Sequence, residues 1–181
     1  CTTDDPVDSL EWHKVLAEDD TFEVKVLPAW RPDKAMNIEK PEYLDYLKTL
    51  SDVSGITVNS FASLMDALRN RMEFFASMGC CVSDHALEYV MYKPYTTEEI
   101  EKIFAKRFAG ETITVDEMNK FKTAFMVSVG KEYNKLNWVM QLHYGTIRDN
   151  NTLRYNQLGP DTGYDCINTY DCSAEMAQFL N

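Results

Sequence analysis

Apolar residues recur at helical spacing through several stretches of the chain, and capping signals mark where these stretches begin. Ser60 precedes one stretch. Thr96 and Thr114 each stand three residues before a glutamate, which is the spacing of a capping box. The pattern predicts helices over residues 6–17, 41–50, 60–78, 96–108, 115–134 and 173–180.

Three shorter stretches have patterns typical of strands. Residues 22–29 alternate apolar and polar, whereas residues 80–83 and 138–143 are mainly apolar. Each gap between these strands holds two predicted helices, although a simple βα unit needs only one. The pattern therefore predicts an α/β framework with helical insertions, in which most residues are helical.

Charge and cysteine content narrow the classes of function. The net charge of −11 argues against nucleic acid and against anionic membranes, because both attract basic surfaces. No apolar run approaches the ~20 residues of a membrane span. The five cysteines include no CxxC pair, which favours a reducing cytoplasm over a disulfide framework. We interpret Cys80 and Cys81 as small buried apolar residues.

Polar side chains stand where the three predicted strands end. Arg31 follows the first strand, Asp84 and His85 follow the second, and His143 closes the third. Catalytic residues of parallel α/β barrels gather at the carboxyl ends of strands, so these positions are candidates for one shared site. Separate strand ends that simply face the surface are the alternative, since analogy of fold does not establish function.

Each candidate residue also has a purely structural interpretation. Arg31 can form a salt bridge with Asp33, and residues 83–85 can cap a helix. His143 can be a hydrogen-bonded core histidine, although its polar neighbours favour a site. Arg148 can be a solvated arginine of a loop. The sequence alone leaves these alternatives open.

Three tracts of the chain stand out when they are taken together. They are VLPAWRPDK at 26–34, GCCVSDH at 79–85, and QLHYG at 141–145 with Arg148, Asn150–Thr152 and LGPDTG at 158–163. In this order and at these separations, with Thr2–Pro6 at the start, they resemble the uronate isomerases of the amidohydrolase superfamily. The resemblance runs from one end of the chain to the other.

The resemblance implies a partial (β/α)8 barrel, α/β by parentage and mostly α by content. A complete barrel of this kind needs about 250 residues, so the chain is expected to be an internal segment that begins as the third strand ends and stops after the sixth. The expected barrel parts are residues 1–35, 79–90 and 137–181. The expected helical insertions are residues 36–78 and 91–136.

The implied parent activity is aldose–ketose isomerisation of hexuronates, D-glucuronate to D-fructuronate and D-galacturonate to D-tagaturonate. Asp84 is expected to orient groups or remove a proton, His85 to donate one, and His143 to bind substrate or transfer a proton. The expected catalytic residues are thus Asp84, His85 and His143. The expected substrate-binding residues are Arg31, Gln141 and Arg148.

The sequence departs from the family at its metal site. The family's ligands include a His-x-His pair on the first barrel strand and an aspartate on the last, whereas the only histidines here are His13, His85 and His143. We therefore expect a divalent metal, zinc by preference, in the longer parent and none in this segment alone. Metal binding by His143 is a minority alternative.

The expected partners are a small-molecule hexuronate and the remainder of the barrel, and neither nucleic acid nor a membrane. The isolated chain is expected to be inactive, and its exposed strand edges could pair in a homo-oligomer. Two other interpretations stay open. One is a helical interaction module without chemistry, and the other is a metal-dependent hydrolase of the same superfamily.

Overall fold

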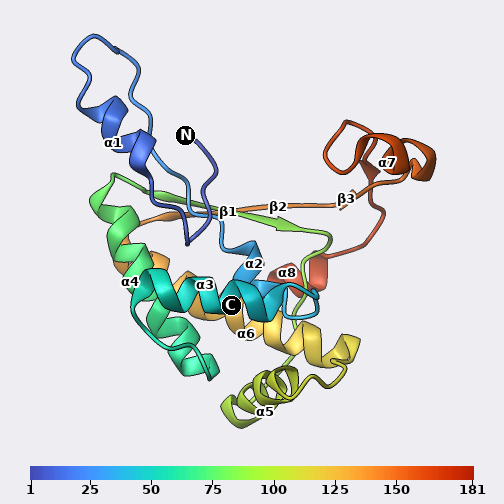
Figure 1. The fold of residues 1–181 in the computed structure, drawn as a ribbon. Helices are drawn as coiled ribbons and strands as arrows, with labels where there is room; N and C mark the ends of the chain where they lie inside the picture. Colours follow the sequence, from blue (N-terminus) through green and yellow to red (C-terminus); the bar gives the residue numbers. More distant parts are fainter.

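The computed structural model of the protein describes residues 1–181 and consists mainly of helices gathered on one side of two parallel strands (Figure 1). The helices are α1 (Glu11–Ala17), α2 (Asp33–Met36), α3 (Tyr43–Ser54), α4 (Phe61–Ser77), α5 (Thr97–Phe108), α6 (Val115–Leu136), α7 (Thr152–Leu158) and α8 (Ser173–Phe179). The strands are β1 (Val82–Leu87), β2 (Val139–Tyr144), β3 (Thr146–Ile147) and β4 (Cys166–Ile167). The expected predominance of helix is confirmed.

Four segments follow one another in parallel across the molecule, in chain order. β1 pairs with β2, Trp30 bridges Ser83 on the other side of β1, and Asp4 bridges Trp30. The backbone bonds from Trp30 N to the Val82 carbonyl (3.0 Å) and from Asp84 N to the Trp30 carbonyl (2.8 Å) hold the central pairing. Because all four segments run the same way, their carboxyl ends lie at one edge.

The predicted strand at 22–29 is corrected by the structure. Only its last residues pair, through bonds between Ala29 and the chain near Thr2 and Asp4. The preceding residues form part of a projecting loop after α1, where Val24 is 64 % exposed. An alternating pattern fits a strand only where another strand is available to pair with it, and none lies beside this loop.

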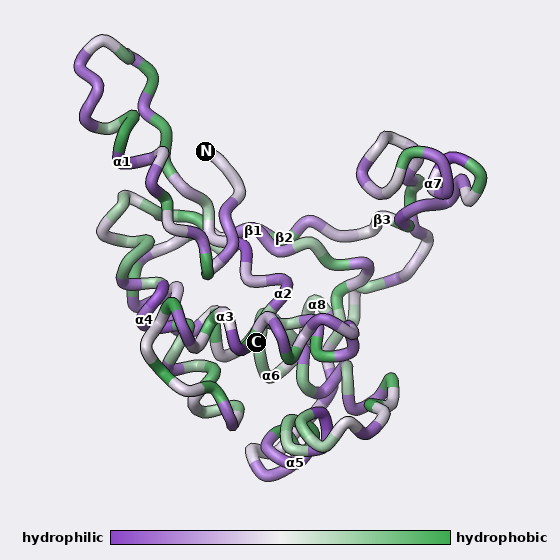
Figure 2. Tube along the Cα trace, in the orientation of Figure 1, coloured by the Kyte–Doolittle hydropathy of each residue, from purple (hydrophilic) through white to green (hydrophobic).

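Capping residues place the long helices where the sequence predicted them. Ser60 accepts from Ser63 N at the start of α4, and Thr96 accepts from Glu99 N at the start of α5. Thr114 does the same for Glu117 N at the start of α6. These side chains satisfy backbone donors that have no partner inside the helix, so the helix starts were predictable. Each of these helices contains both hydrophobic and hydrophilic residues along its length (Figure 2).

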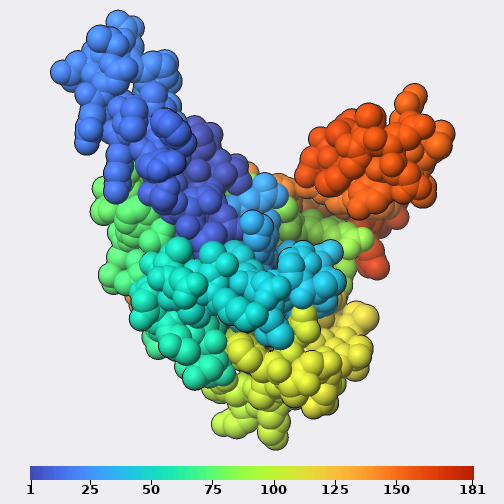
Figure 3. Space-filling model, viewed as in Figure 1, coloured from blue at the N-terminus to red at the C-terminus, as the bar shows by residue number.

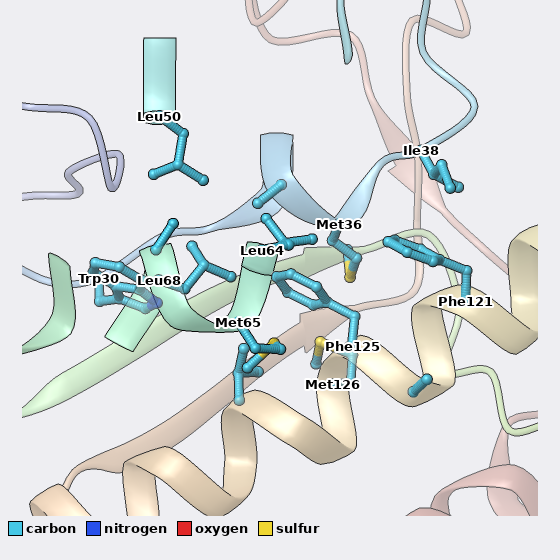
Figure 4. Packing of buried hydrophobic residues seen from close by; sticks show 14 of the residues in the cluster. Trp30, Met36, Ile38, Leu50, Leu64, Met65, Leu68, Phe121, Phe125 and Met126 are labelled. Atoms are coloured by element: carbon cyan, nitrogen blue, oxygen red, sulfur yellow. The ribbon is translucent and has the colours of Figure 1, made fainter. Parts of the chain in front are cut away.

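The hydrophobic core lies between the helices and one face of the strands (Figure 4). Trp30, Leu64 and Phe125 are among its fully buried residues. Trp30 packs edge-on against Phe75, with the ring centroids 4.9 Å apart, and so ties the central strand segment to α4. Helical cover buries this face of the strands, whereas the opposite face has no such cover.

Two arms project from the other side of the helical body (Figure 3). One holds α1 and the loop after it. The other runs from β3 through α7 to β4, which pairs antiparallel with β3. In Figure 1 no helix crosses the strand face between the arms. This uncovered surface, on the side of β1 and β2 away from α4 and α6, is called the open face below.

Several local expectations were wrong or incomplete. α1 begins at Glu11 and not near Pro6, because Leu10 takes a left-handed conformation at the helix start. The short elements α2, α7, β3 and β4 were not predicted. Cys80 is buried as expected, but Cys81 is exposed. None of the helices has both the length and the apolar character that crossing a membrane requires.

Candidate functional site

The strand register gathers a polar cluster on the open face. Asp84 lies opposite Gln141, and His143 lies opposite Ala86, so the three polar side chains share one side of the β1–β2 pair. Asp84 Oδ1 accepts a hydrogen bond from Gln141 Nε2 at 3.0 Å and lies 2.7 Å from His143 Nδ1. Asp84 is itself largely buried beneath these neighbours. The cluster therefore holds its carboxylate in a fixed position.

Arg31 joins the cluster from the neighbouring strand segment. Its NH1 lies 3.6 Å from Asp84 Oδ2, and its Nε donates to Asp33 Oδ2 at 2.8 Å. The structural alternative, a salt bridge with Asp33, is therefore present, and it occurs together with a place in the cluster. Partial burial opposes the charge of Arg31, but the hydrogen bond and the charge of Asp33, aided by Asp84, raise its pKa above the ordinary value.

Asp33 is a member of this cluster that was considered from the sequence only as a salt-bridge partner. Its Oδ2 also accepts from Ala86 N at 3.3 Å, whereas its Oδ1 is buried with no hydrogen-bond partner. Burial raises the pKa of Asp33, and the adjacent Arg31 offsets this only in part. Because this oxygen is shielded from solvent, Asp33 acts on the cluster through Arg31. In the sequence, Asp33 directly follows Trp30–Arg31–Pro32, and this position could have marked it as a site residue.

His85 does not belong to the cluster, which corrects the prediction that it works beside Asp84. Neighbouring residues of a strand point to opposite faces, so His85 points toward the helices and is fully buried. Its ring centroid lies 5.7 Å from that of Tyr133, and neither ring nitrogen has a hydrogen-bond partner. Burial lowers the pKa of His85 to about 3, so the ring is neutral and belongs to the core.

The side chain of His143 is accessible to solvent and is also held in place by Asp84. Its side chain is 38 % exposed, so it is not an enclosed core histidine. With Nδ1 against Asp84, the ring leaves Nε2 without a partner from the protein. A histidine fixed by a carboxylate through one nitrogen can use the other to accept or donate a proton.

Arg148 lies near the cluster but is held by other carboxylates. Its NH1 donates to Asp165 at 2.9 Å and lies 3.2 Å from Asp161. Arg148 and His143 nevertheless line one cavity of about 340 Å³ at the carboxyl ends of β1 and β2. Lys40 also lines this cavity and was missed in the sequence, because it lies in an irregular loop outside every motif.

The donors in this chain do not by themselves make a metal centre. No group of three or more His, Cys, Asp or Glu side chains is arranged to hold an ion. A catalytic zinc usually takes three protein ligands. Asp84 and His143 would supply two, and these two contact each other. Metal binding by His143, the minority alternative, stays a prediction.

A comparison with protein families places the whole chain in one of them. The model of the glucuronate isomerase family matches residues 1–181. The uronate isomerase of Lachnospira eligens is 86 % identical over 181 residues, and that of Lachnoclostridium phytofermentans is 73 % identical over the same length. Both matches cover 100 % of this chain and 39 % of the relative.

Solved structures give the same result for the fold. A crystal structure of uronate isomerase from Thermotoga maritima matches all of this chain and 40 % of its own, with a TM-score of 0.93 and 37 % identity. Glucuronate isomerase from Caulobacter crescentus matches 99 % of this chain and 37 % of its own, with a TM-score of 0.88 and 26 % identity. The chain spans about two fifths of the length of these relatives, and it belongs to the glucuronate isomerase family.

Proposed function

We propose that this chain forms one wall of the active site of a longer uronate isomerase, which converts aldohexuronates such as D-glucuronate and D-galacturonate into ketohexuronates. The single observation that carries the proposal is the Asp84–His143 contact of 2.7 Å on the open face. The names of the relatives favour an isomerase over a hydrolase. A helical interaction module would have no need of a carboxylate–histidine pair on the open face of two parallel strands.

The chemistry requires hydrogen movement between neighbouring atoms of the open-chain sugar. One hydrogen leaves C2 and one arrives at C1, while a hydroxyl proton passes from the oxygen on C2 to the oxygen on C1, so the composition is unchanged. In our proposal His143 exchanges a proton with substrate at Nε2. Asp84 holds the ring through Nδ1 and stabilises its protonated form.

The other cluster members bind and orient. Gln141 donates to Asp84 through its amide and fixes the carboxylate that faces His143. The guanidinium of Arg31 can hold a substrate oxygen, since the Arg31 side chain is still 31 % exposed beside Asp33. Asp33 holds the Arg31 side chain in place by accepting a hydrogen bond from its Nε. Arg148 is proposed as a more distant substrate contact.

The order of the parallel segments supports a partial barrel. Asp4, Trp30, β1 and β2 follow one another in space as they do in sequence, which is how successive strands of a (β/α)8 barrel are arranged. In this proposal the open face is the barrel interior, and residues beyond this chain complete it. The division into barrel parts and helical insertions stays a prediction, as do a divalent metal held by residues outside the chain and a cytoplasmic location.

The unpaired edge of β2 can pair with another strand, and this affects whether the isolated segment self-associates. β2 pairs with β1 on one side only, so a row of backbone groups on its other side lacks a strand partner. In a longer protein the next strand can take this place. In the isolated segment a second copy can do so, and we therefore propose that the segment self-associates.

The decisive experiment measures uronate-to-ketouronate conversion by the longer enzyme and by the 181-residue chain. We expect turnover by the longer enzyme only. His143→Gln in the longer enzyme should lower kcat by about 10²- to 10⁴-fold, the usual contribution of a general acid–base group. His13→Gln is the matched control, because His13 contacts Thr2 at the other end of the strands. Equal activity of His143→Gln and the parent would overturn the proposal.

A further inference from the structure

The cavity beside His143 is built from the carboxyl ends of β1 and β2 and from the loop between α2 and α3. Lys40 comes from this loop, Ala86 and Glu88 come from the end of β1, and His143 comes from β2. Its volume of about 340 Å³ lies within the range of sites for small molecules. A ligand in this cavity would touch His143 and so reach the polar cluster.

Lys40 is the cation of this cavity that no carboxylate of the chain neutralises. Arg31 is paired with Asp33, and Arg148 is paired with Asp165. Lys40 forms no ion pair. Glu88 is the only carboxylate among the lining residues. In a chain with a net charge of −11, an unpaired lysine in such a cavity can attract an anion.

The loop that carries Lys40 is fixed at several points. Arg107 of α5 donates to the backbone carbonyls of Ile38 at 2.9 Å and of Lys40 at 2.8 Å. The adjacent Glu39 is occupied by Lys122 of α6 at 2.8 Å, so it does not compete for the Lys40 ammonium. The backbone of Lys40 is thus held in place while its side chain stays exposed.

We propose that Lys40 is a substrate-binding residue that pairs with the carboxylate of the hexuronate in this cavity. The inference rests on the proposed function and deepens it, since it names the group that recognises a sugar acid rather than a neutral sugar. Arg31, held by Asp33, is then left to bind oxygens of the sugar chain. The carboxylate lies at the far end of an open-chain hexuronate from the reacting carbons, so Lys40 contributes to binding and not to proton transfer.

The test is Lys40→Met in the longer enzyme, assayed with D-glucuronate. We expect KM to rise about tenfold or more, the loss typical of a charged hydrogen bond, with kcat within about twofold of the parent. Lys40→Arg should recover part of the affinity, because it keeps the charge. Lys102→Met is the matched control, since Lys102 is an exposed lysine of α5 that lines neither cavity beside this loop.

A second substrate identifies the group that Lys40 recognises. D-glucuronamide replaces the carboxylate with an uncharged amide, so Lys40→Met should change its KM little. An unchanged KM for D-glucuronate, or an equal rise for both compounds, would overturn the inference. Calorimetric binding of D-glucuronate separates the two proposals. Binding that depends on Lys40 in a protein without turnover would overturn the proposed reaction alone, and binding indifferent to Lys40 would overturn this inference alone.

Discussion

Asp84 Oδ1 and His143 Nδ1 lie 2.7 Å apart along a diagonal of the β1–β2 pair. Asp84 is in register with Gln141, and His143 is in register with Ala86. The contact thus joins residues that are not direct cross-strand partners. Diagonal neighbours on one sheet face are within reach of long side chains. The pairing of strands therefore builds the acid–base pair.

Asp84→Asn should impair catalysis more than folding. Asparagine keeps the shape and can still contact Gln141, but it removes the charge that stabilises a protonated His143. We expect kcat of the longer enzyme for D-glucuronate to fall about 10²-fold or more, with a smaller change in KM. Asp52→Asn on the exposed side of α3 should leave both values unchanged. Similar losses in the two variants would show that Asp84 has no special role.

Phe125→Ala should strongly destabilise the helical body. Phe125 is fully buried in α6, stacked on Phe121 at 6.4 Å between ring centroids, and its truncation leaves a cavity. We expect the free energy of unfolding to fall by about 3–5 kcal/mol in urea titrations. Phe22→Ala makes the same chemical change in the projecting loop, where Phe22 is 43 % exposed, and should cost about 0.5 kcal/mol. Equal costs would contradict the position assigned to the core.

Thr114→Ala should weaken the start of α6. Thr114 Oγ1 accepts a hydrogen bond from Glu117 N at 3.2 Å, and Glu117 Oε2 accepts one from Thr114 N at 2.8 Å. Loss of such a cap costs about 1 kcal/mol, measurable as a lower midpoint of thermal unfolding. Thr112→Ala, in the exposed residues just before the helix, is the control and should have little effect. A neutral Thr114→Ala would mean that packing alone sets the start of α6.

The parts of the fold that sequence predicted are those encoded by local signals. The capping residues Ser60, Thr96 and Thr114 carry their information within three positions, and the helices they begin were located closely. The apolar run at 138–143 located β2, whereas the run at 80–83 overlaps β1 only at Val82 and Ser83. Asp84 and His85, which were expected after the strand, lie inside it. The pairing at Trp30 depends instead on partners far away in the chain, and it was displaced from the expected strand.

The residues of the candidate site were predicted in part, and the errors in this prediction have a physical cause. Asp84 and His143 come together because two strands align in one register, which no local pattern specifies. The exclusion of His85 follows from strand alternation, but only once it is known which face the helices cover. Lys40 could not be found at all, because its position depends on how Arg107 holds an irregular loop.

The buried histidine should make stability depend on pH. Burial lowers the pKa of His85 in the folded protein to about 3, from an ordinary value of 6.5. Between these values the unfolded chain binds a proton at this residue and the folded protein does not. The contribution of neutral His85 is therefore complete above pH 6.5 and is lost as the pH falls toward 3, with a slope of at most about 1.4 kcal/mol per pH unit.

His85→Phe removes this proton-binding group and keeps a ring that can pack against Tyr133. Free energies of unfolding, measured in urea at several pH values below neutrality, should fall less steeply for the variant than for the parent chain. Other groups titrate in the same pH range. The effect of His85 is therefore the difference between the parent and the variant in how the free energy of unfolding depends on pH. His13→Gln is the control, because it removes a histidine that is not among the groups acting on the pKa of His85 and should leave the steep fall in place. Parallel curves for His85→Phe and the parent would mean that water or a partner group reaches His85 in the folded protein. The ring would then not be the isolated core residue that its position against Tyr133 indicates.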